Sequence, residues 1–243
     1  MDIKHLCEII GQSNNIVFFG GAGMSTESGI ADFRSENGIY KTSVGYLYPP
    51  ETMLSHSFFC SHTVDFYNFY REKMIFKNAQ PNPGHIALAT LEQLGRLKCV
   101  VTQNIDGLHQ LAGSKTVYEL HGSVHRNYCT KCRKFYPLDY IADSRDIPLC
   151  SQCGGIVKPD VVLYEEVLDD LVVNDAIAAI SKAEVLIVGG TSLVVYPAAG
   201  LINYFKGDKL ILINKGSTPY DSKATMVFHQ PVGKLLSDAV NML

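Results

Sequence analysis

Two pairs of cysteines constrain the fold of this chain more than any other feature of its sequence. Each pair has the spacing Cys-x-x-Cys, and seventeen residues lie between the pairs: Cys129, Cys132, Cys150 and Cys153. In a zinc ribbon, two such knuckles supply four thiolates to one tetrahedral ion. The spacing therefore predicts a Zn²⁺ site made of these four cysteines. Two disulfides or a redox-active pair are the alternatives.

The predicted zinc ion is structural. Four sulfur ligands fill a tetrahedral coordination shell and leave no position for water, so the metal stabilises its module and takes no part in catalysis. Gly154 and Gly155 follow the second knuckle and supply the permissive backbone of a tight turn. Zinc ribbons can also bind nucleic acid, but this loop carries nearly as many carboxylates as cations.

Composition and charge exclude several classes of protein. The 243 residues are 47% hydrophobic and 19% charged, which is enough for one large domain or for a domain with insertions. The formal net charge is −3 and no run of Lys or Arg exceeds two residues, so we expect no direct nucleic-acid partner. A basic partner fits a net negative charge at least as well as an acidic one.

We expect a cytoplasmic protein with no membrane partner. Residues 1–8 resemble an amphipathic helix and not a secretion signal, and the longest apolar runs are far below the roughly 20 residues of a membrane span. The three unpaired cysteines, Cys7, Cys60 and Cys99, are widely scattered. This distribution favours a reducing compartment over a disulfide framework.

Short apolar runs alternate along the chain with segments of helical spacing. The runs are rich in β-branched residues and are each followed by glycine or a polar turn: 16–19, 99–101, 185–188 and 210–213. The helical segments lie between them: 83–94, 171–183 and 198–205. This alternation predicts an α/β fold with a Rossmann-like, doubly wound parallel sheet whose strands are buried on both faces.

Two stretches interrupt the alternation. Segment 33–80 is rich in aromatic residues and predicts a small inserted helical module, and segment 124–157 holds the paired cysteines of an inserted zinc-binding module. The remaining segments, 1–32, 81–123 and 158–243, would then form the Rossmann-like domain. We expect the functional site in the cleft between this domain and the insertions.

A glycine-rich loop follows the first predicted strand. Segment 20–26 opens a helical stretch, where backbone amides and the helix dipole can hold a pyrophosphate. The usual dinucleotide fingerprint has a third glycine where Thr26 stands and an acidic residue about twenty positions later, and both are missing. Segment 28–34 is charged and aromatic instead, placed where it can fold over a nucleotide. The alternative is a glycine turn that only packs helix on strand.

Polar residues follow three of the predicted strands: Gln103, Asn104 and Asp106; Gly190, Thr191 and Ser192; and Asn214. Carboxyl ends of parallel strands line one crevice, and amides, hydroxyls and a carboxylate there suit ribose hydroxyls. Ordinary turns and helix caps are the alternative for each group alone. His121 precedes the cysteine module and should lie at the mouth of the cleft, although a lone histidine is commonly a packed or capping residue.

Taken together, these motifs resemble the sirtuin (Sir2-like) family of NAD-dependent protein deacylases, of bacterial type. The glycine loop, segment 28–34, segment 103–106, His121 with Gly122, and the cysteine quartet follow the family's order and separation through nearly the whole chain. The resemblance implies that NAD is a co-substrate that is cleaved and not reduced. It also implies acylated lysine-containing proteins or peptides as partners, and lysine, nicotinamide and O-acetyl-ADP-ribose as products of acetyl-lysine.

The resemblance also implies roles for individual residues. His121 would be the catalytic base, taking a proton from a ribose hydroxyl after nicotinamide has left. The nicotinamide pocket would be formed by Ala22, Ile30, Phe33, Ile105 and Asp106. The full cofactor-binding set would be Gly21, Ala22, Gly23, Thr26, Ile30, Asp32, Phe33, Arg34, Gln103, Asn104, Ile105, Asp106, Gly190, Thr191, Ser192, Asn214 and Val232.

Segment 158–164 resembles the strand to which the substrate peptide adds as an extra strand. The implied substrate-binding residues are Val162, Leu163, Tyr164 and, from the helical module, Tyr67. Family members usually carry glycine where this chain has Glu165. We expect the extra charge to favour basic residues beside the target lysine.

The acyl group is predicted from the helical module. Desuccinylating members of the family pair a tyrosine with an arginine three positions later, whereas Tyr67 is followed at that spacing by Tyr70. Arg71 lies about 100° further round a helix and should point elsewhere. The sequence therefore predicts deacetylation over desuccinylation.

Two other functions fit parts of the pattern. A protein ADP-ribosyltransferase would use the same cleft to transfer ADP-ribose to a protein nucleophile. An NAD-sensing zinc-ribbon binding module would bind the nucleotide and release no nicotinamide. A dehydrogenase is not expected, because the glycine loop lacks the usual fingerprint.

Overall fold

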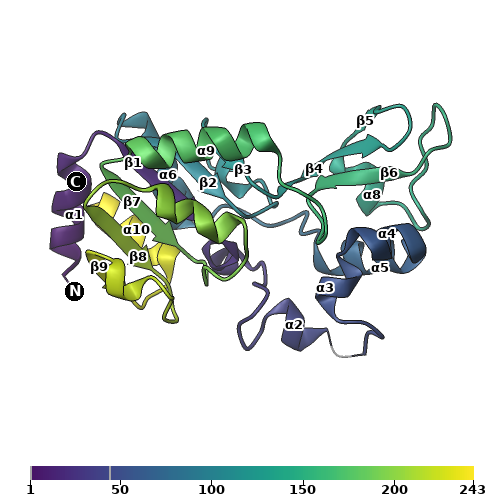
Figure 1. Cartoon of the computed structure of the whole chain (residues 1–243), viewed down its shortest axis with the longest axis horizontal. Helices are drawn as coiled ribbons and strands as arrows, with labels where there is room; N and C mark the ends of the chain where they lie inside the picture. Colours follow the sequence, from purple (N-terminus) through teal and green to yellow (C-terminus); the bar gives the residue numbers. More distant parts are fainter. Residues whose placement is uncertain (1, 44) are drawn as a thin grey trace.

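A parallel sheet forms the larger part of the molecule in the computed structural model, which describes residues 2–43 and 45–243. Its six strands are arranged in the order β3-β2-β1-β7-β8-β9 (Figure 1). All the pairings are parallel, which confirms the predicted Rossmann-like sheet. The strands are β1 (Ile16–Gly20), β2 (Leu97–Thr102), β3 (Val117–Glu119), β7 (Val185–Gly189), β8 (Lys209–Ile213) and β9 (Met226–Phe228).

Helices cover both faces of this sheet. On one face α1 (Ile3–Gln12), α6 (Pro83–Gln93) and α10 (Val232–Val240) contribute to one apolar core. On the other face α9 (Asp170–Lys182) and the 3₁₀ helix η3 (Ala198–Tyr204) contribute to a second. The residues of β1 and β7 are buried throughout, as expected for strands covered on both sides.

The helix boundaries follow local chemistry. Asn82 caps α6, because its side-chain oxygen accepts from the backbone N–H groups of Gly84 and His85, and Pro83 occupies the first turn. Gly95, at φ 73°, follows its end. The helix expected over 198–205 is a 3₁₀ helix instead, and Gly200 in its interior weakens an α-helix at that point.

The helical module and the zinc module pack together at one end of the molecule, away from both termini (Figure 1). The helices are α2 (Ile39–Thr42), α3 (Pro50–Met53), α4 (His56–Ser61) and α5 (Thr63–Lys73). The zinc module has an antiparallel sheet in the order β5-β4-β6 and one helix: β4 (Gly122–Cys129), β5 (Phe135–Tyr136), β6 (Val157–Val161) and α8 (Leu138–Ala142).

These two modules share a single apolar core. Phe66 and Tyr70 of α5 belong to the same buried cluster as Val124, Tyr136 and Val157 of the zinc module. The small sheet also reaches beyond the bounds expected for the module, from residue 122 to residue 161.

The remaining short helices are α7 (Leu108–Leu111) and the 3₁₀ turns η1 (Ala22–Met24), η2 (Thr26–Ser28) and η4 (Asp221–Lys223). Of the helices that the structure describes, none is long and apolar enough to span a membrane.

Candidate active site

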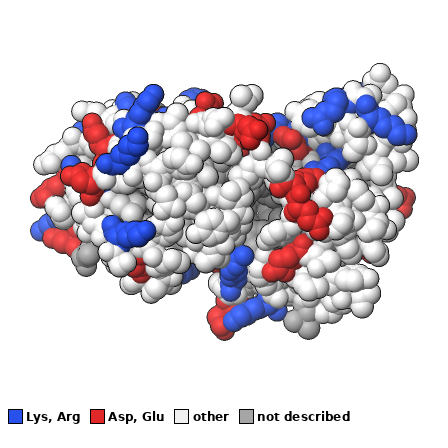
Figure 2. Space-filling model, viewed as in Figure 1, with Lys and Arg blue, Asp and Glu red and all other residues white. Residues whose placement is uncertain are grey.

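A cleft of about 930 Å³ lies between the sheet domain and the two modules. Figure 2 shows the hollow, with acidic side chains along one side of it. The sheet explains its position: the chain runs from β1 outward to β3 on one side and from β7 outward to β9 on the other, so β1 and β7 flank the switch point. The whole predicted cofactor set lines this cleft, together with His121, Val162, Leu163 and Tyr164.

The glycine loop lies against the loop that follows β7. The N–H of Gly23 donates to the carbonyl of Gly190 at 2.8 Å, and a Cβ atom added to Gly23 would lie 2.8 Å from the Gly190 Cα. Gly190 itself is at φ 63°. These glycines therefore allow close packing of two loops as well as close approach of a ligand. The segment forms the 3₁₀ turns η1 and η2 and not the opening of a longer helix.

A buried polar network joins the glycine loop to the loop after β2. The hydroxyl of Ser25 donates to Asp106 Oδ2 at 2.6 Å and accepts from Asn104 Nδ2 at 3.0 Å. The N–H of Leu108 donates to Asp106 Oδ1 at 2.9 Å. Burial raises the pKa of Asp106, and the Ser25 hydroxyl opposes this shift by bonding the ionised form. The network fixes the carboxylate in the wall of the cleft.

Gln103 connects two sides of the cleft. Its side-chain Nε2 donates to Thr191 Oγ1 at 3.1 Å, which links the loop after β2 to the loop after β7. Its backbone carbonyl lies 2.9 Å from Nδ1 of His121. Since a carbonyl oxygen only accepts, Nδ1 is the protonated nitrogen and Nε2 carries the free lone pair. Burial lowers the pKa of His121 from the ordinary histidine value, so the neutral imidazole is favoured.

The segment after η2 folds into a turn at the edge of the cleft. Asp32 Oδ1 accepts from the backbone N–H groups of Arg34 and Ser35, so this carboxylate stabilises the turn. The guanidinium of Arg34 lies 5.3 Å from the ring centre of Tyr40, and Phe33 packs edge-on against the same ring. The turn thus presents a cation and an aromatic ring to the cleft.

The peptide-loop residues continue from β6, which is an edge strand of the small sheet. The N–H of Val162 donates to the carbonyl of His121 at 3.0 Å, so this loop adjoins the predicted base. Tyr164 differs from the expectation for a strand that receives a peptide. Its backbone N–H donates to Leu54 and its carbonyl accepts from the N–H of His56, so both groups are already bonded to the helical module.

Tyr67 was predicted to bind the substrate, and in this structure it is not among the residues that line the cleft. Its side chain is fully buried and its hydroxyl donates to the carbonyl of Val157 at 2.6 Å, outside the residues that line the cleft. Tyr70 lines the cleft instead. Arg71 points elsewhere, as expected, because its guanidinium donates to Ser144 Oγ and to the carbonyl of Asp146.

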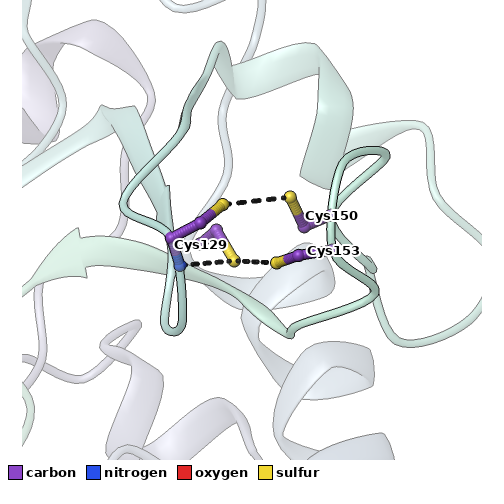
Figure 3. A group of neighbouring side chains, drawn as sticks. Cys129, Cys150 and Cys153 are labelled. Carbon is purple, nitrogen blue, oxygen red and sulfur yellow. Dashed lines mark hydrogen bonds between the residues drawn. The ribbon is translucent and has the colours of Figure 1, made fainter.

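The four predicted metal ligands come together. Their sulfur atoms all lie within 4.8 Å of one another, and Figure 3 shows Cys129, Cys150 and Cys153 directed at a shared centre. The Cys129–Cys153 and Cys132–Cys150 sulfur pairs are 3.4 and 3.6 Å apart, too far for disulfide bonds of about 2.05 Å. Thiolates around Zn²⁺ at about 2.3 Å would be about 3.8 Å apart. The quartet fits a structural zinc ion, as predicted.

Comparison with known proteins identifies the family. The sequence profile of the Sir2 family matches residues 21–197, which is most of the chain. The chain belongs to the Sir2 family. The NAD-dependent protein deacetylase of Clostridium acetobutylicum is 64% identical over 239 residues, covering 98% of each chain. That of Clostridium tetani is 61% identical over 241 residues, covering 99% of this chain and 98% of the relative.

Solved Sir2 structures share the whole fold. A Sir2 variant with a deacetylated p53 peptide and 3′-O-acetyl ADP-ribose has a TM-score of 0.90 at 41% identity, and covers 100% of this chain and 98% of its own. A Sir2 structure with a p53 peptide and NAD⁺ has a TM-score of 0.87 at 40% identity, with the same coverage.

Several cleft residues of this Sir2 family chain were absent from the predicted set. Ser25 bridges Asn104 and Asp106, and its signal was its place between Gly23 and Thr26 in the glycine loop. Tyr70 of α5 and His125 of β4 also line the cleft. Helical spacing alone does not separate Tyr70 from the core positions of its helix.

Proposed function

We propose that this chain is an NAD-dependent protein-lysine deacetylase. It would convert acetyl-lysine, NAD and water to lysine, nicotinamide and O-acetyl-ADP-ribose. The observation that carries the proposal is His121, which lines the same cleft as the glycine loop and the peptide loop and keeps its Nε2 lone pair free. The relatives named NAD-dependent protein deacetylases, and Sir2 structures with NAD⁺ or an acetyl ADP-ribose beside a peptide, support it.

His121 would act as the general base. After the acyl oxygen has attacked the ribose carbon and nicotinamide has left, a ribose hydroxyl must lose its proton to attack the acyl-derived carbon. A neutral imidazole takes that proton on Nε2, while the Gln103 carbonyl holds Nδ1 and stabilises the resulting imidazolium. Burial lowers the pKa of His121 and so keeps the base form populated at neutral pH.

Asp106 would hold the carboxamide of nicotinamide. Its two oxygens accept from Ser25 and Leu108, and a carboxylate has acceptor capacity beyond two bonds. Ala22, Ile30, Phe33 and Ile105 would surround the ring with apolar surface that excludes water, as cleavage of NAD by an acyl oxygen requires. In this reading the buried Ser25 positions the carboxylate and does not touch the ring.

The other cofactor contacts divide between the two halves of NAD. Arg34, Gln103 and Asn104 would position the phosphates and the reacting ribose. Asn214 donates through Nδ2 to the carbonyl of Gly216, so its Oδ1 can accept from a ribose hydroxyl. The remaining residues would contact the pyrophosphate and adenosine: Gly21, Gly23, Thr26, Asp32, Gly190, Thr191, Ser192 and Val232.

The substrate side would be built by the two modules. We propose that 1–32, 81–123 and 158–243 form the NAD-binding domain, and that 33–80 and 124–157 complete the peptide groove. An acylated protein or peptide would lie along Val162, Leu163 and Tyr164, which line the cleft next to the edge strand β6. We place the protein in the reducing cytoplasm, because four thiolates must stay unoxidised to hold the structural zinc.

NAD labelled in its adenosine part tests the reaction class. The deacetylase predicts label in free O-acetyl-ADP-ribose and an equal amount of nicotinamide, only when an acetyl-lysine peptide is present. Label attached to protein would identify an ADP-ribosyltransferase. No nicotinamide release with any acyl peptide would identify an NAD-sensing binding module.

A further inference from the structure

The peptide loop lies directly on the helical module. The backbone N–H of Tyr164 donates to the carbonyl of Leu54 at 3.0 Å, and the N–H of His56 donates back to the carbonyl of Tyr164 at 2.9 Å. Together these bonds form a parallel bridge between Tyr164 and Ser55. The loop that would contact substrate is therefore joined to an element more than one hundred residues earlier in the chain.

Glu165 adds a side-chain connection at the same place. One of its carboxylate oxygens accepts from the backbone N–H of Ser57 at 2.9 Å, and the other accepts from the Ser57 hydroxyl at 2.9 Å. Ser57 lies in the first turn of α4, where a backbone N–H has no partner within the helix. The carboxylate thus satisfies a donor that would otherwise need water.

The backbone of Glu165 is held in an unfavourable conformation. Its φ is 76°, in the left-handed region that glycine adopts freely and that a residue with a side chain rarely adopts. Such a conformation persists where the surrounding contacts over-determine it. The two bonds to Ser57 are such contacts, because they hold the side chain of residue 165 in place. Both can form only when that side chain is a carboxylate.

The neighbouring Glu166 has different partners. Its Oε2 accepts from the Leu163 N–H at 2.9 Å and lies 3.1 Å from Lys158 Nζ, while its Oε1 lies 2.9 Å from His56 Nδ1. Glu166 therefore closes the loop on itself and on β6, and also meets the start of α4. Of these two glutamates, Glu165 is the one whose carboxylate accepts hydrogen bonds only from the helical module.

We infer that Glu165 is a positioning residue that latches the peptide loop to α4 and so holds one wall of the substrate groove in place. The inference rests on the proposed deacetylase function. This role replaces the expectation that Glu165 recognises basic residues of the substrate, because both of its carboxylate oxygens already accept hydrogen bonds from Ser57. A wall ordered before the peptide arrives reduces the conformational entropy lost on binding. The latch should therefore act on KM for the peptide and leave kcat unchanged.

Variants at position 165 separate the bonds from the backbone strain. Glu165→Ala removes both bonds and keeps the strained backbone, so the peptide KM should rise about tenfold. Glu165→Gly removes the bonds and also the strain, and should raise KM less. Glu165→Gln keeps one acceptor and should have the smallest effect. Asp65→Ala, at an exposed carboxylate of the same module, is the control and should leave KM unchanged.

Ser57→Ala tests the partner. Combined with Glu165→Ala it should add nothing to the KM of the single Glu165 variant, because both changes break one connection. Fully additive effects would contradict the latch. Peptides with basic or neutral residues beside the acetyl-lysine distinguish it from charge recognition. The latch predicts an equal rise in KM for both peptides in Glu165→Gln, and a rise confined to basic peptides would overturn it.

Amide hydrogen exchange provides a readout that does not depend on activity. In the free protein, Glu165→Ala should speed exchange at residues 54–57 and 162–166 and leave β1 and β7 unchanged. Unchanged protection of those two segments would overturn the latch even if the enzyme deacetylates as proposed. Faster exchange in a protein that releases no nicotinamide would support the latch and refute the deacetylase function instead.

Discussion

The imidazole of His121 donates its Nδ1 proton to the backbone carbonyl of Gln103, over a distance of 2.9 Å. This bond fixes the tautomer and the ring orientation, and it comes from the loop that also supplies Asn104 and Asp106 to the cleft. The proposed base is therefore positioned by the same segment that supplies two of the proposed cofactor contacts. The sequence position of His121 alone suggested a packed or capping residue. The hydrogen bond to Gln103 shows that Nε2 is the nitrogen left free.

The pH dependence of turnover follows from the environment of His121. Burial lowers its pKa below the ordinary value of 6.5, although the bond to Gln103 partly opposes the shift. A lowered pKa leaves the imidazole neutral, and so competent as a base, at pH values where a free histidine is already protonated. The acid limb of kcat/KM should therefore have its midpoint below pH 6.5. A pH–rate profile with a midpoint above that value would contradict this assignment.

Acyl-chain preference follows from the side chains near the acyl site. Arg71 is engaged by Ser144 and Asp146, and Tyr70 offers no positive charge to a carboxylate. Since an unpaired carboxylate is costly to bury, kcat/KM for an acetyl-lysine peptide should exceed that for the succinyl-lysine peptide by about a hundredfold. Parallel kinetics on the two peptides measure this ratio, and faster desuccinylation would refute the prediction.

Two buried histidines should make the fold sensitive to acid. His85 and His109 are 0% and 1% exposed, and their ring centres are 4.7 Å apart. Burial lowers the pKa of His85 to about 4 and, with a contribution from His85, that of His109 to about 3. The unfolded chain binds protons below pH 6.5 while the folded chain does not, so stability is complete above that pH and falls below it.

The expected loss is about 2 kcal/mol per histidine between pH 6.5 and pH 5. Urea unfolding at a series of pH values measures it, with His109→Gln as the variant that should lose less. A free energy of unfolding that stays constant between these pH values would show that the pair takes up protons in the folded protein as it does in the unfolded chain, and would contradict the lowered pKa values.

Removal of zinc should lower deacetylation strongly without unfolding the parallel sheet. The cysteine quartet anchors the small sheet, whose core is shared with Phe66 and Tyr70 of the helical module. Chelation should therefore disorder the peptide groove and lower activity about tenfold or more, with recovery when Zn²⁺ is returned. Cys129→Ala should behave like the chelated protein. Full activity in zinc-free protein, with its metal content measured, would contradict a structural role.

Much of the fold follows from local patterns. The apolar runs of β1 and β7 are long and continuous because both faces are buried, so the sequence predicts them directly. The edge strands β3 and β9 have three residues each, too few for a recognisable period. The two modules were predicted separately, because their common core joins residues of α5 to residues of β4 and β6 that are far apart in the sequence.

The candidate site was likewise predictable from the sequence only in part. The motif residues of the cofactor set were predicted from their order and spacing, and all of them line one cleft. Tyr67 is not among the residues that line the cleft, and helix α5 is apolar around much of its circumference: Phe66, Tyr67, Phe69 and Tyr70 are all fully buried. The spacing of these residues does not tell which of them faces the cleft. The partner of Glu165 was equally hidden, since Ser57 is 108 residues away.

Nicotinamide release with an acetyl-lysine peptide, compared between the wild type and His121→Ala, tests the role of His121 most directly. Loss of a general base typically slows turnover by ~10²–10⁴-fold. We expect turnover with the acetyl-lysine peptide to fall by a factor in that range while the affinity for NAD is retained. The substitution removes only the imidazole ring, whose hydrogen bond is to the backbone carbonyl of Gln103. Undiminished turnover in the variant would contradict the mechanism.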